Sequence, residues 1–177
     1  MVSNLGIIVS TVDGPSPSRI NFVVNDGFAH KGMFVELNYS EGTMICMIDE
    51  LIKTNRYFER PDSVKMIGVE LEKNFPTSDW EFLLASAKPL GVFKNGLIQR
   101  STFPPSPGTE VFVAKNDNIK KFLGLEKDGL NLGKIQFHDI ELKLNMSKLL
   151  QKHLAVVAQS GAGKSFLMSV ILEELQK

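Results

Sequence analysis

The chain has 177 residues, of which 43% are hydrophobic and 23% charged, and its formal net charge is zero. This composition is typical of a folded globular protein, and it excludes a disordered chain and a strong overall electrostatic footprint for nucleic acid. The single Cys46 argues against a disulfide framework, and the lack of a secretory signal or a long apolar run predicts a cytoplasmic protein that does not enter a membrane.

The first third of the chain predicts short strands separated by turns. Residues 5–12, 19–24 and 33–39 are apolar, β-branched or alternating, and Gly, Pro, Asn and Asp clusters bound them. Residues 43–53 suit either a strand or a helix, and the tight turns around them favour a long strand in an antiparallel meander. Four strands in little over fifty residues favour a small β-barrel or a β-sandwich.

The middle of the chain is less clearly patterned, and residues 64–75 cannot be assigned. Ser78 to Glu81 reads locally as a helix capping box. Residues 82–93 suit a strand or a helix, and we favour a strand because a barrel needs further strands to remove its edges. We then expect an extended or looped segment at 91–102, a stiff Pro-rich connector at 103–109 and a closing strand at 110–114.

A helix and a linker follow. Residues 117–123 predict a short helix with Asn116 or Asp117 as its N-cap and Gly124 just past its end. We expect a linker from Gly129 to Phe137 and a short alternating strand from Ile140 to Leu144.

The segment from His153 to Ser165 predicts a phosphate-binding P-loop. An apolar run suited to a buried parallel strand starts near Leu154, a turn of small residues follows, and Lys-Ser opens a helix-forming segment. The strict P-loop pattern has Gly where this chain has Ala158, so the match is to the relaxed form. A plain turn between strand and helix would leave Gly-Lys-Ser at the helix start unexplained.

Each residue of this loop has an expected role. Gly161 and Gly163 let the backbone adopt positive φ and approach an anion closely. Lys164 is the expected catalytic residue on the β and γ phosphates, and the Ser165 hydroxyl is the expected Mg²⁺ ligand. The predicted ATP-binding set is therefore Ser160, Gly161, Ala162, Gly163, Lys164, Ser165 and Phe166.

The final helix, from Phe166 to Leu175, is apolar on most sides and is therefore expected to be buried on most sides. One strand and one helix cannot enclose it, because a P-loop sheet needs several parallel strands. We therefore expect the front part of a longer protein, without the acidic strand and the arginine finger that hydrolysis requires. The overall prediction is β-rich: a barrel of about six strands at 1–115, a helix and linker at 116–152, and a truncated RecA-like α/β domain at 153–177.

The order of these elements resembles the archaeal HerA family of hexameric DNA translocases. The residues that carry the resemblance are Asn55–Glu59, Pro107–Val111, Gly133–Ile135, Glu141–Asn145, Leu149–Leu150, His153–Ala155 and Ser160–Ser165. The resemblance implies a barrel of the type found in ATP synthase head subunits, which helps build a homo-oligomeric, hexameric ring. It also implies an ATP- and Mg-dependent helicase that moves duplex DNA in end resection and double-strand break repair, with a NurA-type nuclease as partner.

Two alternatives remain open. The chain can be an oligomerisation and docking module with little or no ATPase activity, since the hydrolytic half is not in this sequence. A rotary ATP synthase head subunit shares the order of barrel and P-loop, but such subunits usually carry a Gly-rich lead-in and a Thr after the lysine, where this chain has Ala158-Gln159-Ser160 and Ser165.

Overall fold

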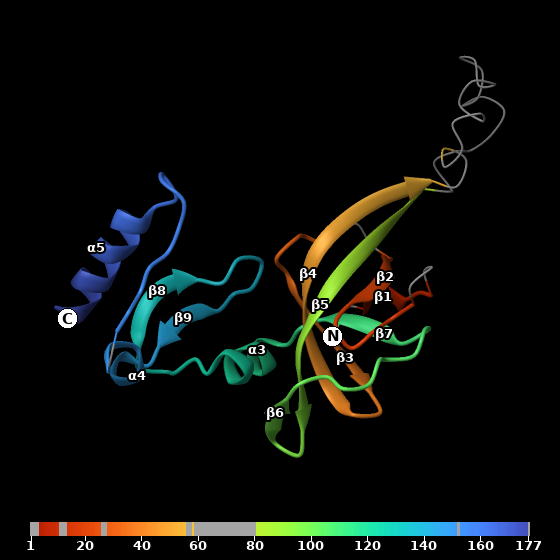
Figure 1. Cartoon of the computed structure of the whole chain (residues 1–177), viewed down its shortest axis with the longest axis horizontal. Coiled ribbons are helices and arrows are strands. Elements are labelled where there is room, and N and C mark those ends of the chain that lie inside the picture. Colours follow the sequence, from red (N-terminus) through yellow and green to blue (C-terminus); the bar gives the residue numbers. More distant parts are fainter. Residues whose placement is uncertain are drawn as a thin grey trace, which may run out of the picture. The chain divides into compact units, whose positions relative to one another are not determined.

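The computed structural model describes residues 4–10, 14–25, 28–55, 58, 81–151 and 153–176. The chain divides into two compact units, Met1–Ala114 and Lys115–Lys177, and each is described by itself. The helices and strands of both units are labelled in Figure 1.

The first unit is a closed antiparallel β-barrel. Its strands are β1 (Asn4–Ile8), β2 (Ile20–Val24), β3 (Phe34–Tyr39), β4 (Gly42–Asn55), β5 (Glu81–Lys94), β6 (Leu97–Gln99) and β7 (Glu110–Val113). Neighbouring strands follow the order β2-β1-β7-β3-β4-β5, and the pairing of β2 with β5 closes the ring, with β6 added to β5. The predicted barrel of about six strands is confirmed, and so is the closing strand, which lies between β1 and β3.

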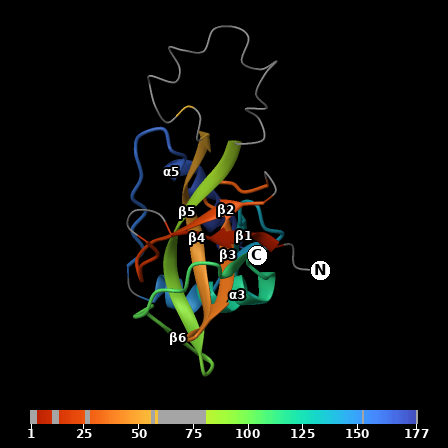
Figure 2. The ribbon, with the colours of Figure 1, turned by 90° about the vertical axis from the view of Figure 1, so that its right-hand side faces the viewer.

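Two long strands account for much of this sheet. β4 and β5 have 14 residues each and run side by side, as both views show (Figures 1 and 2). Their register shifts twice, between Ile45 and Cys46 and between Ile48 and Glu50. Pro89 pairs with Cys46 at the first shift. A proline cannot donate to a strand ladder, so its place at an irregularity explains how β5 continues through it.

The barrel core follows from the alternation of the strands. Ile20, Phe22 and Val24 point to one face of β2, and Met44, Cys46 and Ile48 do the same on β4 before the second shift. Every closing strand contributes buried apolar side chains: Leu5, Ile8, Ile20, Phe22, Val24, Val35, Leu37, Met44, Cys46, Ile48, Ala85, Ala87, Val92 and Val111. Burial raises the pKa of the Cys46 thiol, so this cysteine behaves as a small apolar core residue.

The less patterned middle segment is partly clarified. The strand favoured at 82–93 is confirmed as β5, and the expected extended segment at 91–102 contains the turn at Asn95-Gly96 and β6. The unassigned residues 64–75 and the first three residues of the Ser78–Glu81 capping box lie outside the described residues. Glu81, the last of that box, begins β5.

The second unit contains α3 (Asn116–Leu123), β8 (Leu130–Lys134), β9 (Glu141–Leu144), α4 (Met146–Leu150) and α5 (Lys164–Leu175). The predicted helix at 117–123 is confirmed, and Gly124 ends it with φ 65° as expected. The predicted N-cap is wrong, because Lys115 occupies that position and Asn116 lies inside the helix, where its Nδ2 donates to the Asp139 carbonyl oxygen at 3.4 Å. No helix in the described ranges is long and apolar enough to cross a membrane.

The predicted linker at 129–137 is wrong, because Leu130–Lys134 forms β8 and pairs with the correctly expected strand β9. Cross-strand pairs explain why this segment becomes a strand: Leu130 lies opposite Leu144, and Lys134 lies opposite Glu141. The pattern of residues 130–134 alone does not reveal these partners. α5 packs against β8, and the Asn131 N–H donates to Glu174 Oε2 at 3.3 Å.

The strand expected from Leu154 is also wrong. Residues 153–159 have no regular secondary structure, and Val157 is 92% exposed. A strand needs a neighbour to satisfy its backbone groups, and in the described part of this unit β8 and β9 pair with each other. The described part of this unit does not enclose α5, as expected: Ile171 is the one fully buried residue of the helix, while Phe166 and Leu172 are exposed.

Candidate nucleotide-binding loop

The loop before α5 is a tight turn whose backbone requires its two glycines. The Ala162 N–H donates to the Gln159 carbonyl oxygen at 3.1 Å, which closes the turn. Gly161 has φ 80° and Gly163 has φ 86°, which is the left-handed region that side chains with a Cβ rarely adopt. A Cβ at either position would have no other heavy atom within 4 Å. Conformation, and not close packing, therefore explains the glycines.

Lys164 folds back over this turn. Its ammonium group donates to the carbonyl oxygen of Ala158 at 2.7 Å and to that of Gln159 at 3.0 Å. The side chain is half-buried, although the residues on both sides of it are exposed. The loop therefore holds the lysine charge directly beside its own backbone, and not extended into solvent.

The start of α5 faces the same turn. Its first residue is Lys164, and the Leu167 N–H donates to the Gly163 carbonyl oxygen at 2.9 Å. The cap residue Gly163 has no side chain that could accept from the first N–H groups of the helix, so the turn leaves them to an external acceptor or to water. The N-terminal end of a helix carries partial positive charge and favours anions.

These residues fit a nucleoside triphosphate with Mg²⁺. The glycine-containing turn, the ammonium group and the helix start carry positive charge or donors, which is the chemistry that phosphate oxygens require. Ser165 follows the lysine directly and is exposed, and its backbone carbonyl accepts from the Ser169 hydroxyl at 3.1 Å. Ser160, Gly161, Ala162 and Gly163 are exposed, and Phe166 is 75% exposed.

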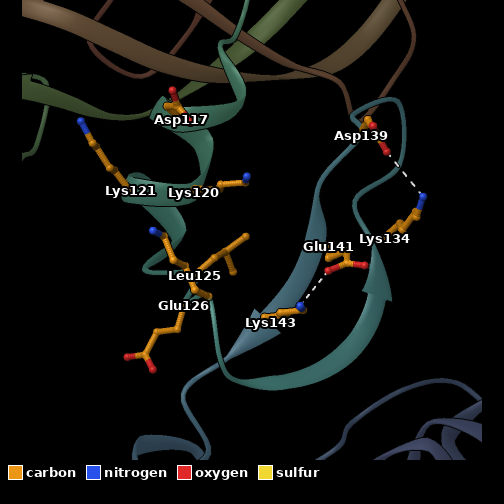
Figure 3. A pocket seen from close by; sticks show the side chains of 10 residues that line it. Asp117, Lys120, Lys121, Leu125, Glu126, Lys134, Asp139, Glu141 and Lys143 are labelled. Carbon is orange, nitrogen blue, oxygen red and sulfur yellow. Dashed lines mark hydrogen bonds and ion pairs between the residues drawn. The ribbon is translucent and has the colours of Figure 1, made fainter.

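A second feature of this unit was not anticipated from the sequence. A hollow of about 730 Å³ lies beside α3 and the β8–β9 hairpin (Figure 3). Five lysines and four carboxylates line it together with one leucine: Asp117, Lys120, Lys121, Leu125, Glu126, Lys127, Lys134, Asp139, Glu141 and Lys143. The adjacent Lys120 and Lys121 were the signal in the sequence for a charged surface. The hollow itself could not be foreseen, because its other side is the β8–β9 hairpin, part of which was predicted as a linker.

The chain is similar to known proteins of one kind. A family model described as the central domain of helicase HerA matches residues 130–177. A probable helicase of Methanocaldococcus jannaschii is 30% identical over 181 residues, which cover 99% of this chain and 34% of that protein. The chain is similar in sequence to HerA-type helicases.

Other HerA-type relatives agree. The DNA double-strand break repair helicase HerA of Pyrococcus furiosus is 29% identical over 94 residues, which cover 52% of this chain and 17% of that protein. A probable DNA double-strand break repair helicase HerA of Methanocaldococcus jannaschii is 33% identical over 101 residues, 56% of this chain and 20% of that protein. The chain thus spans about a third or less of the length of these HerA-type relatives.

The resemblance expected from the residue pattern is therefore confirmed at the level of the HerA family. The segment matched by the HerA model contains β8, β9, α4, the glycine turn and α5.

Proposed function

We propose that the chain is part of an ATP-driven, DNA-translocating helicase that acts in double-strand break repair, and that Ser160–Ser165 is its ATP site. The observation that carries this proposal is the position of the Lys164 ammonium group, 2.7 Å from the Ala158 carbonyl oxygen across a turn with two left-handed glycines. Relatives named as DNA repair helicases support the reaction class. Their names favour this function over that of an ATP synthase subunit.

The roles within the loop follow from the donors. The backbone of residues 160–163 would hold the phosphates, Lys164 would contact phosphate oxygens, and Ser165 would hold Mg²⁺. Bound ATP and Mg²⁺ supply the high-energy phosphoanhydride and the metal that neutralises its charge. The chain's own residues bind and orient the nucleotide. We expect this chain by itself to bind ATP with little or no turnover.

The barrel is proposed to assemble the ring and to dock the nuclease partner. Barrel closure is compatible with this role, because the pairing of β2 with β5 leaves the closing strands without free edges. A hexameric ring and a NurA-type nuclease are the partners that the family resemblance implies. Size measurement in solution by light scattering tests the assembly role, and a chain that stays monomeric at high concentration contradicts it.

Equilibrium ATP binding to the chain, with Lys164→Ala and Lys148→Ala compared, tests the nucleotide site. Lys148 is an exposed lysine of α4 whose removal changes the charge equally. We expect Lys164→Ala to lose most of the ATP affinity and Lys148→Ala to keep it. In the longer protein, Lys164→Ala is expected to abolish ATP turnover, and unchanged turnover there excludes Lys164 from the mechanism.

A further inference from the structure

The hollow beside α3 is a built feature, because hydrogen bonds join its two walls at both ends. At one end Asn116 Nδ2 donates to the Asp139 carbonyl oxygen at 3.4 Å. At the other end the Glu126 N–H donates to the Lys143 carbonyl oxygen at 3.0 Å, and Asn145 Nδ2 donates to Glu126 Oε1 at 2.6 Å. The separation of helix and hairpin is therefore fixed by main-chain and amide contacts.

The carboxylates of the hollow are largely engaged. Asp139 Oδ1 lies 3.4 Å from Lys134 Nζ, and Glu141 Oε2 lies 2.9 Å from Lys143 Nζ. Glu126 accepts the Asn145 amide described above. Asp117 is the remaining carboxylate of the lining, and Asp128 and Glu174 add negative potential near Lys143.

Three lysines of the same lining have no carboxylate partner among the described residues: Lys120, Lys121 and Lys127. Figure 3 shows Lys120 reaching from α3 toward the hairpin, while Lys121, which also belongs to the lining, projects from the opposite side of the helix. Across the space, Glu141 and Lys143 project from β9 as a pair. The excess of positive charge therefore lies on the α3 side.

The lining also indicates which anion it suits. Leu125 is its one apolar residue and no aromatic ring belongs to it, so the described hollow offers no surface for stacking a base. Lysine is a flexible point charge that binds phosphate without reading sequence. These properties suit a phosphate backbone better than a nucleotide with its base.

We propose that this hollow binds the phosphate backbone of duplex DNA, with Lys120, Lys121 and Lys127 as the contacts. The proposal rests on the proposed function, since it names one place where the chain meets the DNA that the helicase would move. The zero net charge of the whole chain is compatible with it, because the contact is a local cluster.

The test is binding of the chain to a labelled duplex oligonucleotide, measured by fluorescence anisotropy at stepped salt without nucleotide. The Lys120→Gln, Lys121→Gln and Lys127→Gln triple variant keeps the side-chain stems and removes three charges. Each lost phosphate contact lowers the slope of log affinity against log salt by about 0.9, so we expect a fall of about 2 to 3. A slope and an affinity equal to those of the parent chain overturn the proposal, as does a parent chain that binds no duplex.

The matched control is the triple variant Lys31→Gln, Lys88→Gln and Lys94→Gln, which removes three exposed charges from the barrel unit. We expect it to bind the duplex nearly as well as the parent, and an equal loss in both variants overturns a local site. Asp117→Asn removes a negative charge from the lining and leaves every lysine in place. We expect tighter binding from it, and weaker or unchanged binding contradicts the proposal even if the lysine variant folds poorly.

Two further arms separate other sources of negative charge. If the triple lysine variant loses binding of a poly-glutamate peptide but not of duplex DNA, the hollow is a protein-docking site and the proposal fails. If the variant loses binding of inorganic tripolyphosphate alone, the ligand is a free phosphate compound and the proposal fails as well. Lys164→Ala is expected to lose ATP binding and to keep duplex binding. The proposal for the hollow and the proposal for the ATP site can therefore fail separately.

Discussion

The carboxylate of Glu41 accepts the Thr102 hydroxyl on Oε1 at 2.9 Å and the Thr102 N–H on Oε2 at 3.3 Å. Its Oε2 also accepts the Tyr39 hydroxyl at 3.0 Å and the Phe103 N–H at 3.2 Å. One side chain at the β3–β4 turn thereby fastens the connector between β6 and β7. The hydrogen bonds, first that of Thr102 and then that of Tyr39, hold the pKa of Glu41 below its usual value of 4.5.

Loss of this fastening at acid pH is the first prediction. Because the folded pKa is depressed, the stabilising contribution is present above about pH 4.5 and is lost as the pH falls through the folded pKa. Glu41→Gln should lower the Tm of the barrel at pH 7, and the difference from the parent should shrink toward pH 3. Asp49→Asn is the control, since Asp49 is exposed and its side chain forms no hydrogen bond in the described structure. A Tm difference that is constant with pH would contradict the prediction.

Phe22→Ala should strongly destabilise the barrel. Phe22 is fully buried in the core, and its truncation removes apolar contacts and leaves a cavity, at a cost of about 3–5 kcal/mol in the free energy of unfolding. Urea unfolding measures the change. Phe28→Ala removes the same atoms from a side chain that is 68% exposed, and we expect a small effect there. Equal losses in the two variants would mean that Phe22 is not a core residue.

The left-handed glycine before α5 gives a prediction for the nucleotide site. Gly163→Ala places a Cβ where φ is 86°, and left-handed backbone costs about 1–2 kcal/mol for such a residue. If the loop must keep its conformation to bind phosphate, ATP affinity should fall by about tenfold for each 1.4 kcal/mol. Gly108→Ala is closely matched, with φ 87° and open space around it, but lies in the barrel. Gly108→Ala should leave ATP binding unchanged. If Gly163→Ala keeps its ATP affinity while Gly108→Ala loses it, the Gly163 conformation is not required for ATP binding.

His138 should make the second unit sensitive to mild acid. The residue is 9% exposed in the turn of the β8–β9 hairpin, and burial lowers its pKa from 6.5 because desolvation disfavours the charged form. The unfolded chain then binds the proton more readily, so stability is full above about pH 6.5 and is lost as the pH falls from there to the folded pKa. Amide hydrogen exchange of the hairpin at pH 7.5 and 5.5 measures this, and His138→Gln should reduce the difference. His153→Gln, a substitution at an exposed site, serves as control.

The barrel was predictable because its signals are local. Alternation such as that of Ile20, Phe22 and Val24 and clusters of turn residues define each strand without knowledge of its partner. The strand at 82–93 also followed from the need to remove sheet edges. The partners themselves were not predictable, since the pairing of β2 with β5 joins strands far apart in the sequence.

The second unit shows the opposite case. Residues 154–158 are apolar enough for a strand, yet pattern alone cannot supply the neighbouring strand that would pair with them. Leu130–Lys134 has weak alternation and becomes a strand only by pairing with Glu141–Leu144. The glycine turn was placed correctly before a helix because Gly161, Gly163 and Lys164 carry a conformational requirement that neighbours do not alter. Its role in ATP binding is still a prediction.

The place of β7 between β1 and β3 has a consequence for synthesis on the ribosome. Ile7 lies opposite Glu110, so the strand made first must wait for almost the whole unit to emerge before it finds this neighbour. Until Val113 has left the exit tunnel, the nascent chain keeps two unsatisfied strand borders, which can pair with other polypeptides. Ribosomes pausing shortly before this point would therefore hold a nascent chain in which β1 and β3 each still lack the neighbour that β7 supplies.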